Sequence, residues 1–125
     1  MSKGRAVRPL LRPRLYLGND LSLGPGKIDL LRKVGETGSI SAAARALGIP
    51  YKRAWLLIDS INHGFPQPLL DTAIGGKAGG GARLTPLGEA LVRAYEALEA
   101  RLNIAAAAEV AAIEALVGVK KKRPR

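Results

Sequence analysis

The sequence predicts a mainly helical α+β domain with two short β-hairpins, and three observations support this prediction. Apolar residues recur at helical spacing in four stretches, each bounded by glycine, proline or serine. Near residues 15–23, apolar and polar residues alternate on both sides of a turn signal. The glycine-rich stretch 71–85 is typical of two strands joined by a long tip. With 125 residues, 47% of them hydrophobic, the chain is long enough for one domain with a core.

The net charge of +10 is carried by the two ends of the chain. Residues 1–14 hold five cations and no acid, and residues 120–125 hold another five cations and no acid. The segment between them, 15–119, has ten cations and ten acids. We therefore expect a disordered basic tail at 1–14 and a second basic tail at 119–125, both contacting nucleic acid. The alternative is that the tails only keep the protein soluble.

The residue types present exclude several kinds of site. The chain has no cysteine, so it has no disulfide, thiolate metal site or cysteine nucleophile. Its one histidine, His63, lies in a predicted loop with no second metal ligand nearby, and the carboxylates are scattered along helices. We expect no enzyme, no metal and no cofactor. No apolar run approaches the roughly 18 residues of a membrane span, and no secretory signal is evident, so we expect a cytoplasmic protein.

The first elements are a hairpin and a helix. Residues 15–17 and 21–23 are expected to pair as short strands around the intervening turn. The motif GPG at 24–26 marks the start of a helix, because proline is accepted in a first turn. This helix has an apolar face and is expected to end at Gly35 or Gly38.

The next two helices are separated by a very short turn. Ser39 or Ser41 is expected to cap the second helix, because a serine oxygen accepts the free amides of a first turn. Gly48 ends this helix, and Pro50 is well placed to begin a third one that runs to about Asn62. This spacing predicts a helix-turn-helix, in which the second of the two helices enters the major groove of DNA.

The third helix has a core face and an opposite face suited to DNA. Its core face consists of four apolar residues at helical spacing: Ala54, Leu57, Ile58 and Ile61. Its first turn holds the residues best placed to meet phosphates or bases: Tyr51, Lys52 and Arg53. Leu56, at the centre of the outward face, either contacts a thymine methyl group or is a plain exposed leucine. Trp55 is expected to be half-buried in the core rather than to contact a base.

The glycine-rich stretch follows the third helix and is expected to form a wing, a hairpin that touches DNA beside the major groove. Lys77 and Arg83 would then face phosphates or the minor groove. A phosphate-binding P-loop is excluded, because Asp71 stands where its first glycine is required and Ala78 follows the lysine. The dinucleotide fingerprint fails because Leu84 stands at its last glycine. The alternative is a disordered surface loop.

The last helix is expected to be long and to dimerise. Thr85 can cap it, Pro86 can begin it, and its apolar content continues to Val117 within a segment 86–118. A helix of that length spans about 48 Å, too long to lie against one small domain. The residues expected to form the dimer contact are Leu87, Leu91, Leu98, Leu102 and Ile113. The alternative is a helix folded back on its own domain, and Asn103 is the expected weak point.

Together these elements predict a winged helix-turn-helix at 15–85, with a short N-terminal hairpin and a long C-terminal helix. The main interpretation is a homodimer that binds double-stranded DNA at a pseudo-palindromic operator and regulates transcription. Two alternatives stay open: a non-specific architectural DNA-binding protein, and a protein-interaction module that uses the winged domain and the long helix. The candidate DNA contacts are Ser39, Ser41, Arg45, Tyr51, Lys52, Arg53, Leu56, Lys77 and Arg83.

Two motifs resemble a known family. GPGKIDLLRKVGETGSISAAARALGIPYKRAWLLIDSIN, followed by IGGKAGGGARLTPLGEAL, strongly resembles the N-terminal DNA-binding domain of ModE-type, molybdate-responsive transcription regulators. The segment is also similar to the winged helix-turn-helix of LysR-type regulators. The resemblance covers about Gly24 to Leu98. It implies a winged helix-turn-helix that dimerises through a long C-terminal helix, with the recognition segment at 50–59 and the wing at 75–83.

The sequence departs from the family pattern at several positions. The family usually has an acidic and a small residue where this chain has Leu56 and Leu57, so the resemblance does not imply which operator sequence is read. The linker around His63 and Phe65-Pro66 also differs. Molybdate-sensing members carry C-terminal oxyanion-binding modules with a Ser-Ala-Arg-Asn-type motif, and nothing here resembles it. We therefore expect a stand-alone DNA-binding domain without a molybdate site.

Overall fold

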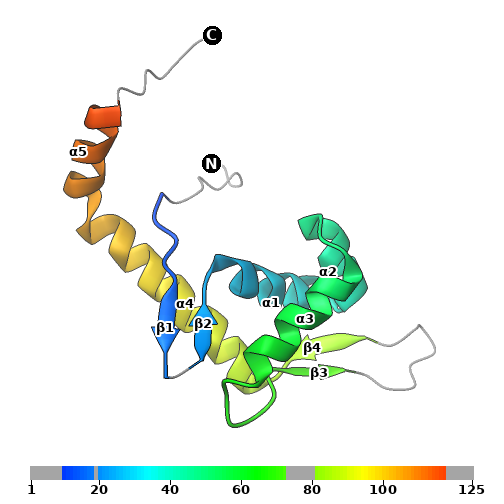
Figure 1. The fold of residues 1–125 in the computed structure, drawn as a ribbon. Coiled ribbons are helices and arrows are strands. Elements are labelled where there is room, and N and C mark those ends of the chain that lie inside the picture. The colour runs from blue at the N-terminus through cyan, green and yellow to red at the C-terminus, as the bar shows by residue number, and fades with distance from the viewer. Residues whose placement is uncertain (1–9, 19, 73–80, 118–125) are drawn as a thin grey trace.

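The computed structural model describes residues 10–18, 20–72 and 81–117 of the chain. Within these ranges the fold is the predicted α+β winged helix-turn-helix, and both strand pairs are antiparallel. Figure 1 shows the elements in the order β1 (Leu15–Leu17), β2 (Leu21–Leu23), α1 (Pro25–Thr37), α2 (Ile40–Leu47), α3 (Tyr51–Asn62), β3 (Leu70–Thr72), β4 (Ala82–Leu84), α4 (Pro86–Ala105) and α5 (Ala107–Val117).

Two glycines set the turns between the first three helices. Gly38 ends α1 with φ of 74°, and Gly48 ends α2 with φ of 71°, a left-handed conformation that favours glycine. The Oγ of Ser39 accepts a hydrogen bond from the Ala42 amide at 3.0 Å, so Ser39 caps α2. Pro50 lies just before α3 in an extended conformation rather than inside the helix. The predicted helix-turn-helix is confirmed.

The core of the domain lies between α1, α2, α3 and the β3–β4 hairpin. Its buried residues come from all of these elements and include Leu30, Leu31, Val34, Ala43, Ala54, Ile58, Ile61, Leu70 and Ala82. The hairpin is joined to the turn after α1, because the Ala82 amide donates to the Gly38 carbonyl at 2.9 Å. Burial of these side chains drives the packing that fixes α3 with its opposite face outward.

The first half of α4 packs on its own domain. Thr85 caps the helix, since its Oγ1 accepts from the Gly88 amide at 3.1 Å. Val92 is buried in the main core, and Tyr95 is buried with Leu23 and Ile28 beneath the β1–β2 hairpin. The alternative of a helix folded back on its own domain therefore holds for this half. Leu87 and Leu91, expected at a dimer contact, pack against the core of the same chain.

The predicted long helix reaches Val117 in two parts, because it breaks at Ala106. This residue has φ of −102° and ψ of 14°, and α5 begins after it. Figure 1 shows α5 leaving the line of α4 at an angle. The break lies just beyond Asn103, the expected weak point, which is itself helical. No helix among the described residues is both long enough and apolar enough to cross a membrane.

The predicted disordered tail is wrong for residues 10–14, which run beside α4 (Figure 1). The side chain of Arg12 bridges α1 and α4: it donates to Asp29 at 2.7 Å and to Glu99 at 3.3 Å. The hydroxyl of Tyr95 donates to the Pro13 carbonyl at 2.6 Å. The segment is ordered because its polar groups find partners on two helices. Residues 1–9 and 118–125, with the remaining cations of both predicted tails, lie outside the described residues.

Candidate nucleic-acid interface

The outward face of α3 is exposed in the way that DNA recognition requires. Tyr51, Lys52 and Arg53 are all exposed in its first turn. Leu56 is 59% exposed at the centre of the same face. The core side of the helix is buried, which fixes this orientation. Four of the predicted DNA contacts therefore lie together on one helix, and recognition helices contact bases mainly through such N-terminal residues.

Trp55 is half-buried on one flank of α3, in agreement with the prediction, although it is not one of the buried core residues. Its side chain is 38% exposed, and its ring meets the ring of Tyr51 edge to face, with centroids 6.3 Å apart at 83°. The two residues are neighbours because positions four apart share one side of a helix. The pair forms an aromatic ridge along one flank of the outward face, while Arg53 lies on the opposite flank.

The preceding helix α2 also carries exposed polar groups among the predicted DNA contacts. Arg45 and Ser41 are exposed, and the Nη1 of Arg45 donates to the Oγ of Ser41 at 3.1 Å. Ser39 uses its oxygen to cap α2, which leaves its hydroxyl proton for another acceptor. Arg45 makes no ion pair with any acid of the described residues, so its charge is available to a phosphate.

The base of the predicted wing is present as the β3–β4 pair. In its register Asp71 stands opposite Arg83, and both side chains are exposed. Arg83 lies in β4, one of the two strands at the base of the predicted wing (Figure 1). Lys77 and the rest of the tip, 73–80, lie outside the described residues.

The far end of the molecule carries a second kind of surface. Leu98 and Leu102 are half-buried on α4, whereas Ile104 is 78% exposed. Helix α5 has no buried residue, although most of its residues are apolar. Its most exposed large side chains are Ile113 at 59%, Leu116 at 85% and Val117 at 66%. An apolar surface of this kind is typical of a contact with another protein chain.

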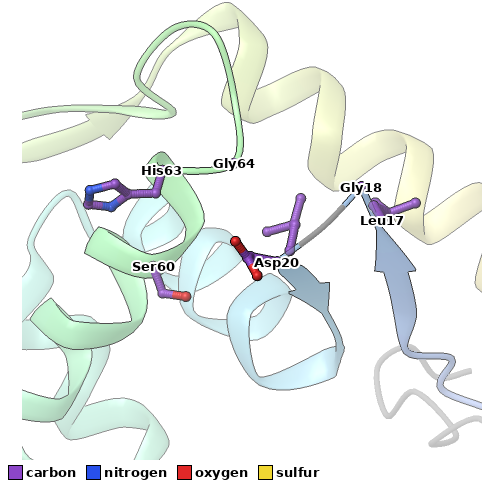
Figure 2. Close-up of a pocket in the computed structure, with 7 residues that line it drawn as sticks. Leu17, Gly18, Asp20, Ser60, His63 and Gly64 are labelled. Atoms are coloured by element: carbon purple, nitrogen blue, oxygen red, sulfur yellow. The ribbon is translucent and has the colours of Figure 1, made fainter.

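A hollow of about 400 Å³ lies between the β1–β2 turn and the end of α3. Asp20, Ser60 and His63 are its polar lining residues. Figure 2 shows the His63 ring directed away from the Asp20 carboxylate, and His63 Nδ1 lies 2.7 Å from the Asp59 carbonyl oxygen. Across the described ranges, no three metal-ligating side chains of His, Cys, Asp or Glu come together.

Two cations that the sequence did not single out lie beside Arg53. Arg14, assigned to the disordered tail, and Lys27, in the first turn of α1, line one cleft with it. Their sequence positions are far from α3, so helical spacing alone does not bring them together. The only sequence signal was that Lys27 follows the GPG helix start. The positive surface near α3 is therefore larger than predicted.

The helix-turn-helix core, the exposed first turn of α3 and the flanking hairpin define a winged helix-turn-helix protein. Residues 26–89 match the bacterial regulatory helix-turn-helix proteins of the lysR family, and the chain belongs to this family. Its description as regulatory agrees with the expectation that the chain is not an enzyme. The match spans α1 to the first turn of α4, including all the predicted DNA contacts.

Several relatives agree with the ModE-like resemblance. Molybdenum-pterin-binding protein MopB of Rhodobacter capsulatus is 51% identical over 97 residues, which cover 78% of this chain and 34% of that protein. DNA-binding transcriptional dual regulator ModE of Escherichia coli K12 is 42% identical over 84 residues, or 67% of this chain and 32% of that protein. Molybdenum transport protein ModE of Azotobacter vinelandii is 39% identical over 94 residues, which cover 75% of this chain and 35% of that protein. The chain thus spans about a third of the length of these relatives.

Proposed function

We propose that this protein is a sequence-specific, DNA-binding transcriptional regulator that acts as a homodimer. The observation that carries the proposal is the outward face of α3. Its first turn presents two exposed cations and a tyrosine, with Leu56 exposed behind them, on a rigid helix-turn-helix core. Membership of a regulatory family and the names of the ModE relatives support the same conclusion.

In this proposal α3 enters the major groove with its first turn toward the bases. Lys52 lies on the outward face and is suited to guanine or phosphate, while Leu56 is suited to a thymine methyl group. Arg83, on the wing, contacts the flanking phosphates or the minor groove. Lys77 has the same proposed role at the tip. Arg45 and Ser41 of α2 add contacts to the backbone, which position the protein without reading sequence.

The proposed dimer contact uses the end of α4 and α5. The exposed apolar residues there have no partner in the described part of the chain, and a second copy would bury them. Leu98, Leu102 and Ile113 keep their proposed roles, whereas Leu87 and Leu91 support the domain itself. A two-fold dimer predicts a pseudo-palindromic operator whose half-sites lie about one helical turn apart, or a multiple of it.

We also propose that these 125 residues bind DNA without a cofactor, molybdate included. The sequence has no resemblance to an oxyanion-binding module, and the proposed DNA contacts are all side chains of the chain itself. Binding should therefore be the same with and without added molybdate. The site of action is the cytoplasm, where DNA is accessible to a bacterial-type regulator. The basic ends, 1–9 and 119–125, add salt-dependent contacts to phosphates.

The test is selection of bound sequences from a random DNA pool at about physiological salt. A two-fold motif is the expected result, and binding to that motif should exceed binding to random DNA by at least about a thousandfold. Tight binding at low salt without enrichment of any sequence would replace this proposal by a non-specific architectural role. Absence of binding even at low salt would favour a protein-interaction module.

A further inference from the structure

A basic cleft lies on the flank of α3, next to the proposed reading face. Its volume is about 360 Å³, and it is lined by the N-terminal segment, the start of α1 and the α2–α3 turn. Arg14, Lys27 and Arg53 bring three cations to it from three separate elements. Its apolar walls come from Leu47 and Ile49 at the turn, and from Leu57.

The three cations of this cleft have no acidic partner among the described residues. None of them takes part in the ion pairs of this part of the chain. Asp29 also lines the cleft, but its Oδ1 already accepts from Arg12 at 2.7 Å and from Arg32 at 2.9 Å. The carboxylate is thus occupied by two arginines outside the cleft, and the local charge inside it is positive.

Arg14 and Lys27 are held close together despite their like charges. The Nζ of Lys27 donates to the Ser22 carbonyl at 2.6 Å, and the Nη1 of Arg14 donates to the Ser22 hydroxyl at 3.0 Å. The pKa of Lys27 is lowered, first by burial and second by the charge of Arg14. The guanidinium of Arg14 lies over the backbone of Gly24, because a Cβ built there would be 2.7 Å from its Cζ. A bound anion would relieve this repulsion.

We propose that the cleft binds a phosphate group, and that the DNA backbone beside the bases read by α3 supplies it. An arginine fork can hold two phosphate oxygens, while the lysine ammonium acts as a point charge. Arg53 connects phosphate binding in the cleft with base reading by α3, because it lies on the flank of α3 that borders the cleft. The choice of DNA as the source rests on the proposed function; the phosphate site rests on the cleft alone.

The first experiment compares Lys27→Gln and Arg14→Gln with a control, Lys33→Gln. Lys33 is a lysine of the same helix, but its charge is balanced by Glu36 at 2.9 Å. Each cleft variant should bind selected and random DNA about three- to tenfold more weakly, and the slope of log K against log salt should fall by about 0.9. Phosphate ethylation interference should lose one phosphate per half-site. The control should change none of these.

A second variant tests the position of Arg14 without removing its charge. Gly24 has φ of −130°, which alanine adopts freely, so Gly24→Ala should fold. The new methyl group would displace the Arg14 guanidinium from the cleft, because its atoms lie 2.7–2.9 Å from the Cβ position. We expect the same loss of one phosphate contact as in Arg14→Gln. An unaltered interference pattern in Gly24→Ala, Arg14→Gln and Lys27→Gln would overturn the DNA contact.

Titration with inorganic phosphate separates the two sources of the anion. In the wild-type protein, the amide signals of Gly26 and Lys27 should shift with millimolar phosphate, and Lys27→Gln should abolish the response. If phosphate binds but the DNA slope is unchanged in the variants, the cleft is a site for free phosphate and the DNA source is wrong. If phosphate shifts no amide signal and the variants keep the salt slope of the wild type, the cleft proposal is overturned. If wild-type protein binds no DNA, the proposed function fails and the phosphate titration still decides the site.

Discussion

The side chain of Asn103 holds both backbone groups of Leu11. Its Oδ1 accepts from the Leu11 amide at 2.9 Å, and its Nδ2 donates to the Leu11 carbonyl at 2.9 Å. This pairing imitates the contact of one strand with another and ties the N-terminal segment to α4. Together with Arg12 and Tyr95, this pairing holds the N-terminal segment along α4. A basic segment that looks like a free tail is thus a structural strap.

Replacement of Asn103 by alanine should release the N-terminal segment. The change leaves the two backbone groups of Leu11 without their partner, at a cost of about 1–3 kcal/mol in the free energy of unfolding. Urea denaturation should show this loss, and amide exchange at Leu11, Arg12 and Arg14 should accelerate more than exchange in α1. Arg101→Ala, an exposed change on the same helix, is the control. Equal exchange in both variants would contradict the strap.

Tyr95 should make the protein sensitive to alkaline pH. Its pKa is raised above the ordinary value of 10.0, first by burial and second by the charge of Glu99. Above about pH 10 the unfolded chain loses this proton while the folded chain keeps it, so stability falls as the pH rises through the folded pKa. Lys27 acts with the opposite sign, because its folded pKa is lowered. A comparison of the wild type with Tyr95→Phe is therefore needed to separate the contribution of Tyr95 to the pH dependence of stability from that of Lys27.

The comparison has a clear expected outcome. At neutral pH, the free energy of unfolding of Tyr95→Phe should be about 0.5–1.5 kcal/mol lower than that of the wild type, because the hydrogen bond to Pro13 is lost. Between about pH 9 and 11 the gap between wild type and variant should narrow, since only the wild type has the tyrosine proton to lose. Thermal or urea unfolding of both proteins at several pH values measures this difference in the free energy of unfolding. A gap that stays constant with pH would show that Tyr95 is not the titrating group.

Two glycines in first turns of helices should respond oppositely to alanine. A Cβ at Gly88 of α4 would lie 2.3 Å from the Leu69 carbonyl oxygen, which is backbone and cannot move aside. Gly88→Ala should therefore lower the free energy of unfolding by about 1–3 kcal/mol or more. Gly26 of α1 has nothing within 4 Å of its Cβ position, so Gly26→Ala should be neutral or stabilise by up to about 1 kcal/mol. Urea midpoints of both variants check the contrast.

Local residues made most of the fold predictable, because they end and begin the elements by themselves. Gly38 and Gly48 adopt left-handed conformations, and Ser39 and Thr85 cap the helices that follow them. The strap was missed because its partners lie far along the chain: Arg12 pairs with Glu99, and Leu11 pairs with Asn103. No local pattern in a basic segment distinguishes an internal ion pair from a phosphate contact.

The break in the long helix was expected near Asn103, but its exact position at Ala106 was not predictable. Ala106 is an excellent helix former, surrounded by more alanine, and carries no glycine or proline signal. Trp55 lies between core and surface, as its position on the helix indicated, and its side chain is 38% exposed. The candidate interface was predictable where it lies on one helix, as with Lys52 and Leu56. The cleft beside Arg53 was not, since three elements build it.

Charge on the apolar surface of α5 should separate the proposed dimer. Leu116 is 85% and Ile113 59% exposed, so Ile113→Asp and Leu116→Asp should leave the folded domain unchanged. Each buries an unpaired carboxylate if a second copy covers this surface, which is strongly unfavourable. Sedimentation at micromolar concentration should show a dimer for the wild type and a monomer for the double variant. Glu114→Gln, a polar change on α5, should stay dimeric; a wild-type monomer would contradict the proposal.

Leu56 should decide one base position of the operator. Its side chain is 59% exposed, so Leu56→Ala should not lower the free energy of unfolding appreciably. If the leucine covers a thymine methyl group, its removal should weaken binding to the selected site by about 1–2 kcal/mol and leave binding to random DNA unchanged. Repeating the selection with the variant should show relaxed preference at a single position in each half-site. Ser60→Ala, an exposed change one turn along α3, is the matched control. If the variant selects the same motif with the same affinity as the wild type, Leu56 is an exposed leucine without a role in recognition, and the specificity of α3 then depends on its first turn.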